Sequence, residues 1–193
     1  MFDFYPLLRP LLFTLDAETA HRAAVKVLAL GLTTDWREPA DPLLAHDLWG
    51  KRFANPVGLA AGFDKNAETL PHIFKLGFGF VEAGSVTPKP QTGNPKPRVF
   101  RLPEQRAVIN RYGMNNEGLD AFLARVKAWR AAGNQELLGI NVSPNKDAVD
   151  GPRDYVTGIT ALAPYADYLV MNISSPNTPG LRGLQNRAEL TQL

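Results

Sequence analysis

Short apolar runs alternate with amphipathic stretches between residues 55 and 173 of the chain. The runs predict buried strands over residues 55–62, 78–86, 137–142 and 168–173. The stretches between them carry apolar residues at helical spacing and predict helices over residues 68–76, 117–132 and 153–164. Strands that alternate with helices at this spacing imply a parallel sheet covered by helices. The pattern therefore predicts an α/β fold.

Residues 1–45 have a different pattern. Met1 to Phe13 is rich in aromatic residues and leucine, and it is interrupted by Pro6 and Pro10. Asp16 can cap a second helix that runs to about Leu30, with Gly31 as its stop. One face of this helix should be apolar, formed by Ala17, Ala20, Ala24, Val27 and Leu28.

Two such short helices have too few large side chains to form a core of their own. They are expected to pack on the main domain, on a partner, or on a membrane surface. The sequence therefore predicts a small helical segment over residues 1–45 and a main α/β domain over residues 46–193.

Polar residues follow every predicted strand at its C-terminal end. The first strand ends in Gly62-Phe-Asp-Lys65 and the second in Gly84-Ser85-Val-Thr87, while the third carries Asn141 and the fourth Asn172. The C-terminal ends of parallel strands meet at one edge of the sheet, where α/β proteins place their chemistry. We therefore expect one shared site. Taken alone, the stretch Asn172–Gly180 also fits an ordinary turn of Ser, Pro and Asn.

Composition narrows the chemistry that such a site can use. The 193 residues carry a net charge of +2 and include no cysteine, which excludes disulfides, thiolate metal sites and cysteine nucleophiles. His21, His46 and His72 lack the spacing of a zinc site, so no metal is expected. An apolar run long enough for a transmembrane helix is absent, and the N-terminus lacks the positive region of a secretory signal.

Residues 87–116 form a basic excursion between the second strand and the helix over residues 117–132. Val99–Leu102 and Ala107–Asn110 are expected to pair as a hairpin. The excursion holds one acid, Glu104, against six cations, namely Lys89, Lys96, Arg98, Arg101, Arg106 and Arg111. Such a segment is either a solvated face or a surface that attracts an anionic ligand. Nucleic acid is not expected, because few aromatic residues are interleaved with the cations.

Four stretches of the chain resemble one family. They are AAGFDKN (Ala60–Asn66), GFGFVEAGSVTPKPQTGNPKPRVFRLPE (Gly77–Glu104), NRYGMNNEG (Asn110–Gly118) and NISSPNTPGLRGLQ (Asn172–Gln185), and Ala20-His-Arg22 also fits. The chain thereby resembles the class 2, quinone-dependent dihydroorotate dehydrogenases. The resemblance implies an FMN-type (β/α)8 TIM barrel with a small N-terminal helical domain. Only about four β/α units are present, so the chain is expected to be a fragment or a chain cut within the barrel.

The resemblance also implies an activity. Members of the family oxidise dihydroorotate to orotate in de novo pyrimidine synthesis, with FMN as hydride acceptor and a quinone as final acceptor. The base would be Ser175, with Thr178 as its relay partner. The lack of cysteine agrees with this, because class 1 relatives use a cysteine as the base. Ser174 would lie on the other side of the strand and serve the structure.

Further roles carry over by resemblance only. The residues expected to bind FMN are Ala61, Gly62, Lys65, Ser85, Asn141 and Asn172. The residues expected to bind the substrate are Lys65, Asn110, Arg111, Tyr112, Gly113, Met114, Asn172 and Asn177. His21 and Arg101 would contact the quinone; without the resemblance, His21 would be interpreted as an exposed helix residue. Two departures are Met114, where many relatives have phenylalanine, and Ser143-Pro144, where relatives often have Gly-Lys.

The resemblance places the protein on a membrane surface, where its N-terminal helices form an apolar quinone tunnel. The lack of an Arg-rich presequence favours the cytoplasmic side of a bacterial inner membrane over the mitochondrial inner membrane. Two alternatives stay open. One is another FMN barrel oxidoreductase, such as a dihydrouridine synthase, which would be expected to have a cysteine acid and an RNA-binding tail. The other is an inactive half-barrel without flavin.

Overall fold

The structure is a computed structural model that describes residues 5–37, 41–178 and 180–193. The start of the predicted Met1–Phe13 run, residues 38–40 of the predicted helical segment, and Pro179 of the Asn172–Gly180 stretch lie outside the described residues.

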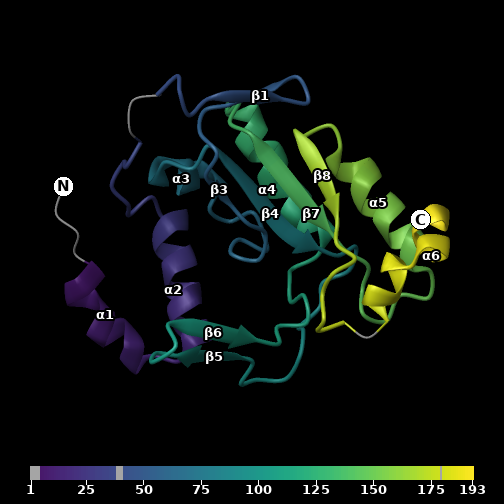
Figure 1. Ribbon diagram of the computed structural model, residues 1–193, viewed down its shortest axis with the longest axis horizontal. Coiled ribbons are helices and arrows are strands. Elements are labelled where there is room, and N and C mark those ends of the chain that lie inside the picture. The colour runs from purple at the N-terminus through teal and green to yellow at the C-terminus, as the bar shows by residue number, and fades with distance from the viewer. Residues whose placement is uncertain (1–4, 38–40, 179) are drawn as a thin grey trace.

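A parallel sheet of four strands organises the main domain (Figure 1). Its order is β3-β4-β7-β8, formed by Gly58–Leu59, Phe80–Val86, Leu138–Val142 and Tyr168–Met171. All three strand pairs are parallel. The predicted α/β class, the parallel sheet and the four strands are therefore confirmed.

The first strand is much shorter than the predicted residues 55–62. Before it, the backbone of Asn55 packs so closely on Gly79 that a Cβ there would lie 2.2 Å from the Asn55 carbonyl oxygen. After it, Gly62 adopts a positive φ of 105° and donates its N–H to the Gly84 carbonyl at 2.7 Å. These local contacts take the flanking residues out of the strand and turn the chain towards the strand ends.

Helices cover one face of the sheet, with α5 running beside β8 in Figure 1. They are α3 (Leu70–Ile73), the 3-10 helix η1 (Phe74–Leu76), α4 (Leu119–Ala131) and α5 (Gly151–Leu162). Phe122, Val126 and Trp129 of α4 are buried in the core, in agreement with the helical spacing of apolar residues predicted for this stretch. Trp129 stacks on Phe74 at a centroid distance of 5.7 Å. The predicted helix over residues 68–76 begins two residues later and changes to 3-10 geometry for its second half. After β8, the chain adds η2 (Leu181–Gln185) and α6 (Arg187–Gln192).

The N-terminal region forms two helices, α1 (Tyr5–Thr14) and α2 (Ala17–Ala29). As predicted, the Asp16 carboxylate caps α2 by accepting from the N–H groups of Glu18 and Thr19, and Gly31 follows its end with a φ of 72°. The expected interruption at Pro10 is wrong, because α1 continues through it.

The apolar face predicted for α2 is wrong in part. Ala24 and Val27 are exposed, whereas Val25 and Leu28 are buried together with Glu18. The helix is rotated because the Glu18 carboxylate faces Arg98 of the main domain. As a result, Val27 and Leu30 stay at the surface.

Two hairpins extend from the main domain. β5 (Val99–Leu102) and β6 (Ala107–Asn110) form the predicted hairpin with the predicted bounds. β1 (His46–Leu48) and β2 (Lys51–Phe53) form a second hairpin that the sequence did not reveal. Its two turn residues, Trp49 and Gly50, have positive φ angles of 54° and 70°. Tryptophan is not typical of a two-residue hairpin turn, which favours Asn, Asp or Gly.

The buried carboxylate of Asp64 fixes the loop that leads into α3. It accepts hydrogen bonds from the N–H groups of Asn66 (3.2 Å), Glu68 (2.9 Å) and Thr69 (2.7 Å), and from Thr69 Oγ1 (2.7 Å). Asp64→Ala leaves these donors without their acceptor, so we expect a loss of about 3 kcal/mol in the free energy of unfolding. Urea unfolding measures it. The exposed Asp147→Ala serves as a control, with a change below about 0.5 kcal/mol; equal changes in both variants would contradict the account.

Candidate functional site

Three of the predicted flavin-contacting residues meet where the strands end. Asn172 Nδ2 donates to Ser85 Oγ at 2.9 Å, and Ser85 Oγ in turn donates to Asn141 Oδ1. Asn141 Nδ2 donates to Glu82 Oε1 at 2.8 Å. The chain of hydrogen bonds thus runs from the end of β8 across β4 to β7, and it brings together residues that are far apart in the sequence.

Glu82 sets the direction of this series of hydrogen bonds, and the sequence did not predict this role for Glu82. Glu82 Oε1 accepts from the amide nitrogen of Asn141, so the amide oxygen of Asn141 is turned to Ser85. Tyr168 donates to the second Glu82 oxygen at 3.5 Å. A charged residue in the middle of an otherwise apolar strand was the available signal, because such a residue is buried only with partners.

Lys65 is a half-buried cation that lies beside the predicted substrate segment. Its ammonium donates to the Gly62 carbonyl and lies 4.1 Å from the centre of the Tyr112 ring. Burial, and then repulsion from Arg98, lower the pKa of Lys65 to about 8. A lysine in this state gains from a bound anion, which stabilises its charged form.

The predicted substrate segment Asn110–Met114 is brought only partly to Lys65. Tyr112 is half-buried between Lys65 and His21, and Met114 is buried. Gly113 has a φ of 71° and packs against Asn94, so a side chain there would be strained. Asn110 is exposed, and the exposed Arg111 donates through Nη2 to the Pro97 carbonyl at 2.9 Å.

The segment after β8 carries the predicted base. Ser175 is half-buried, and its Oγ accepts from the Asn177 N–H at 3.3 Å. Thr178 is buried, but no hydrogen bond joins it to Ser175 within the part of the chain that is described. Tyr155 fixes the start of the segment by donating to the Asn172 carbonyl at 2.6 Å. Ser174 donates its N–H to Asn172 Oδ1 at 3.1 Å.

His21 and Arg101 line one cavity of about 300 Å³ between α2 and the β5–β6 hairpin. The His21 ring meets the edge of Phe63 at 5.2 Å, and burial lowers the pKa of His21 below its ordinary value, with a further contribution from Lys65. Arg101 donates to the Leu15 carbonyl at 2.7 Å. Gly62 lies at the same cavity, so the two predicted quinone contacts adjoin a predicted flavin contact.

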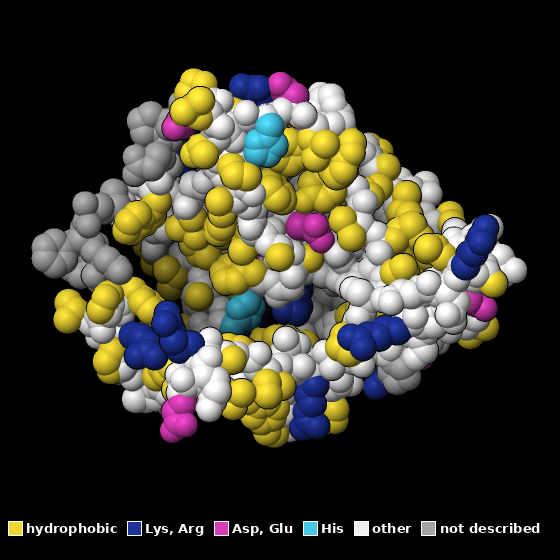
Figure 2. Space-filling view, in the orientation of Figure 1, with side chains coloured by type: hydrophobic (Ala, Val, Ile, Leu, Met, Phe, Trp, Pro, Cys, Tyr) yellow, Lys and Arg dark blue, Asp and Glu magenta, His cyan; other side chains and the backbone are white. Residues whose placement is uncertain are grey.

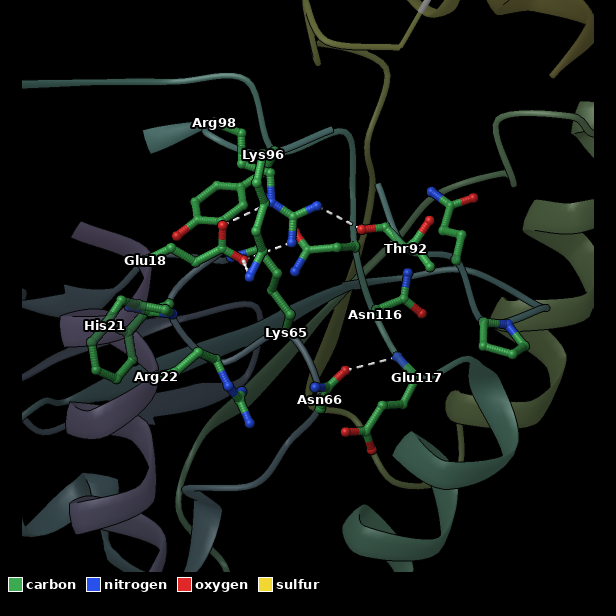
Figure 3. Close-up of a pocket in the computed structure, with 15 residues that line it drawn as sticks. Glu18, His21, Arg22, Lys65, Asn66, Thr92, Lys96, Arg98, Asn116 and Glu117 are labelled. Atoms are coloured by element: carbon green, nitrogen blue, oxygen red, sulfur yellow. Dashed lines mark hydrogen bonds and ion pairs between the residues drawn. The ribbon is translucent and has the colours of Figure 1, made fainter. Parts of the chain in front are cut away.

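A larger cavity of about 950 Å³ lies beside it, and Figure 3 shows the side chains that line it. Figure 2 shows the hollow between α2, the β5–β6 hairpin and the sheet, with histidine and basic side chains at its floor. His21, Phe63 and Tyr112 line both cavities and so form the wall between them. Lys65 faces only the larger, polar cavity.

None of the described helices has the length and hydrophobicity needed to cross a bilayer. Within residues 5–37, 41–178 and 180–193, no group of three His, Cys, Asp or Glu side chains could hold a metal ion.

Residues 43–193 match the family model described as dihydroorotate dehydrogenase. A relative from Rhodospirillum rubrum named dihydroorotate dehydrogenase (quinone) is 58% identical over 193 residues, which is 100% of this chain and 52% of that protein. The mitochondrial dihydroorotate dehydrogenase (quinone) of Mus musculus is 54% identical over 184 residues, 93% of this chain and 47% of that protein.

Among solved structures, dihydroorotate dehydrogenase from Eimeria tenella in complex with ferulenol matches with a TM-score of 0.87 and 47% identity. The match covers 92% of this chain and 49% of that one. The chain therefore spans about half the length of the relatives that it matches.

Proposed function

Because the chain belongs to the dihydroorotate dehydrogenase family, we propose that it carries the substrate-binding half of an FMN- and quinone-dependent dihydroorotate dehydrogenase. One observation carries the proposal. The chain is similar over its whole length to proteins named dihydroorotate dehydrogenase (quinone). The hydrogen-bonded strand ends give that similarity a physical site.

The barrel of this family has eight β/α units, and the sheet here has four strands. We propose that residues 46–193 form the first half of this barrel and residues 1–45 a helical segment associated with it. The inner face of the sheet supports this. Phe80 and Tyr168 face the β1–β2 hairpin across an apolar cavity of about 670 Å³, which further units of a barrel would cover.

The residues at the strand ends fit a flavin. A Cβ added at Gly62 would meet nothing within 4 Å, so the space over its backbone is open to a flat group. Ser85, Asn141 and Asn172 offer amide and hydroxyl groups beside each other, which suits the polar edge of a flavin ring. We propose that these residues, with Ala61 and Lys65, hold FMN. When bound, FMN supplies the acceptor for a hydride from C6 of dihydroorotate.

The remaining chemistry falls to side chains of this chain. Ser175 removes the proton from C5 of dihydroorotate, and Thr178 helps to pass it on. Lys65 binds the carboxylate of the substrate. Asn172 and Asn177, with Asn110 to Met114, hold the ring through donors and acceptors. Loss of one proton and one hydride gives orotate, and the two electrons pass to a quinone.

The cavity that holds His21 and Arg101 is the proposed quinone site. It lies beside Gly62, so a bound quinone would sit close to the proposed flavin position. Exposed Leu7, Leu8 and Leu11 of α1 give the surface near this region an apolar character. Such a face suits contact with the interface of a membrane. We propose that the protein lies on the cytoplasmic side of a bacterial inner membrane.

A steady-state assay tests the proposed function. The full-length protein, meaning this chain with any sequence that continues it, is loaded with FMN and given dihydroorotate and a short-chain ubiquinone. We expect orotate and quinol in equal amounts over many turnovers, and no more than one orotate per flavin when the quinone is left out under anaerobic conditions. Flavin-loaded protein that forms no orotate would reject the proposal. Protein that binds no flavin would favour the inactive half-barrel.

A further inference from the structure

A buried ion pair joins two regions that the proposed function treats separately. Glu18 of α2 and Arg98, which precedes β5, are 7% and 6% exposed. The Arg98 guanidinium donates through Nε and Nη2 to the two oxygens of Glu18, at 2.9 and 2.6 Å. Figure 3 shows the pair at the wall of the larger cavity. A two-pronged bond of this kind fixes orientation as well as distance.

Arg98 also organises the segment that carries the proposed substrate contacts. Its Nη1 donates to the carbonyls of Thr92 (2.6 Å) and Asn94 (3.0 Å). Its own carbonyl accepts from the Arg111 N–H at 2.8 Å. The guanidinium lies 5.5 Å from the centre of the Tyr112 ring. Arg98 therefore links the backbone of residues 92–94 to Arg111, the residue that precedes Tyr112.

Tyr112 is the point where the two cavities meet. Lys65 lies 4.1 Å from its ring centre on the side of the larger cavity, and the His21 ring is 6.5 Å from it. His21 stands one helical turn after Glu18 on α2. These contacts therefore begin and end on α2. Glu18 of α2 binds Arg98, and Arg98 binds the loop that carries Tyr112. Tyr112 in turn lies between Lys65 and His21 of α2.

We infer that the Glu18–Arg98 ion pair positions Tyr112 and thereby aligns the pyrimidine-acid site at Lys65 with the quinone site at His21. The inference rests on the proposed function and adds two positioning residues to it. Neither side chain touches a reacting atom. Their effect on both substrates passes through the Tyr112 ring and the α2 backbone.

Attachment of α2 alone does not require this pair. Arg22 of the same helix forms a second two-pronged bond with Glu68, at 2.7 and 3.1 Å. That pair is more exposed, with side-chain exposures of 40% and 19%, and its partner precedes α3 rather than belonging to the substrate segment. Glu68→Gln is therefore the matched control, since it weakens the attachment of α2 but leaves Arg98 and Tyr112 in place.

The test uses the full-length, FMN-loaded protein with dihydroorotate and a short-chain ubiquinone. For Arg98→Gln we expect the KM values of both substrates to rise about tenfold or more, because small misplacements of binding groups are costly. For Glu68→Gln both values should stay within about twofold, as for most exposed ion pairs. A rise in only one KM, or equal changes in the two variants, overturns the inference.

The pH dependence of kcat/KM for dihydroorotate distinguishes this positioning role from a purely structural role of Arg98, which would leave that dependence unchanged. The charged and titratable groups that face Lys65 are Arg98, Arg22, Glu18, Asp64, Tyr112 and His21. Arg98 lowers the pKa of Lys65, so Arg98→Gln should move the alkaline limb of kcat/KM for dihydroorotate to higher pH. Arg98→Lys keeps the charge and should leave the limb in place while both KM values still rise. An unmoved limb in Arg98→Gln overturns the inference.

Two further results would have a different meaning, namely a variant that does not fold and an unsubstituted protein that dihydroorotate does not reduce. If Arg98→Gln gives no folded protein, Glu18→Gln takes its place, because Arg98 then keeps its carbonyl contacts and loses its anchor on α2. Unchanged KM values in Glu18→Gln overturn the inference. If the unsubstituted protein itself is not reduced by dihydroorotate, the proposed function fails, whatever the ion pair does to stability.

Discussion

Replacing Ser175 with alanine is expected to slow the reduction of the flavin by dihydroorotate about a thousandfold, the contribution typical of general base catalysis. Ser175 follows Asn172, whose side-chain amide donates to Ser85 and whose backbone carbonyl accepts from Tyr155. Within the described residues, its hydroxyl accepts a hydrogen bond from the backbone N–H of Asn177, which leaves a lone pair that can face a substrate proton. Anaerobic stopped-flow mixing of the full-length protein with dihydroorotate measures the rate.

Ser174→Ala is the matched control for this prediction. Ser174 is exposed and differs from Ser175 by one position. Its hydroxyl reaches Asn172 Oδ1 only at 3.4 Å, while its N–H makes the shorter bond and survives the substitution. The rate should therefore change by no more than about threefold, as for a surface hydrogen bond. Rapid reduction in Ser175→Ala, or an equal loss in both variants, would exclude Ser175 as the base.

Replacing Lys65 with methionine is expected to raise the KM for dihydroorotate about a hundredfold. The substitution keeps an apolar stem over Tyr112 but removes the charge that binds the carboxylate. A charge-assisted bond of this kind contributes about 2–3 kcal/mol. The KM for the quinone should change little, since Lys65 faces the polar cavity and not the one with Arg101. Equal effects on both KM values would argue for a general loss of structure.

The same lysine sets a pH dependence. Burial, together with the charge of Arg98, lowers the pKa of Lys65 to about 8. The ammonium form binds the carboxylate, and it is lost as the pH rises through this value. In the unsubstituted protein, kcat/KM for dihydroorotate should therefore fall above pH 8, well below the ordinary lysine pKa of about 10.4. The fall should be absent in Lys65→Met, and a profile that stays level up to about pH 10 would contradict the assignment.

The parts of the fold that the sequence predicted are those in which local pattern and tertiary packing agree. The β5–β6 hairpin and α4 were predicted closely, because alternation in one and helical spacing in the other match the buried positions. The β1–β2 hairpin was missed because Trp49 takes a positive φ that its sequence does not announce. β3 was too long in the prediction because Asn55 and Gly62 are held by contacts from distant residues.

The orientation of α2 shows a second reason why the sequence did not predict part of the fold. Periodicity placed Ala24 and Val27 inside, but the helix turns its charged residue Glu18 inward instead. The partner that makes this possible, Arg98, is 80 positions away along the chain. Sequence spacing on the helix alone contains no information about that partner.

The candidate site was predictable as far as residue types at strand ends determine it. Ser85, Asn141 and Asn172 meet as expected, because parallel strands bring their C-terminal ends to one edge. Glu82, Tyr155 and Arg98 were not predicted, since their roles depend on which hydrogen-bond partners the fold supplies. The roles of Ser175 and Thr178 stay predictions, as do those of the other proposed site residues.

Anaerobic titration of the FMN-loaded, full-length protein with dihydroorotate tests the central claim most directly. The claim is that this chain places a pyrimidine acid against a flavin at the ends of β4, β7 and β8. We predict that dihydroorotate bleaches the visible flavin band with one orotate formed per flavin, and that a short-chain ubiquinone then restores the band. A flavin band that dithionite bleaches but dihydroorotate leaves unchanged would contradict the claim.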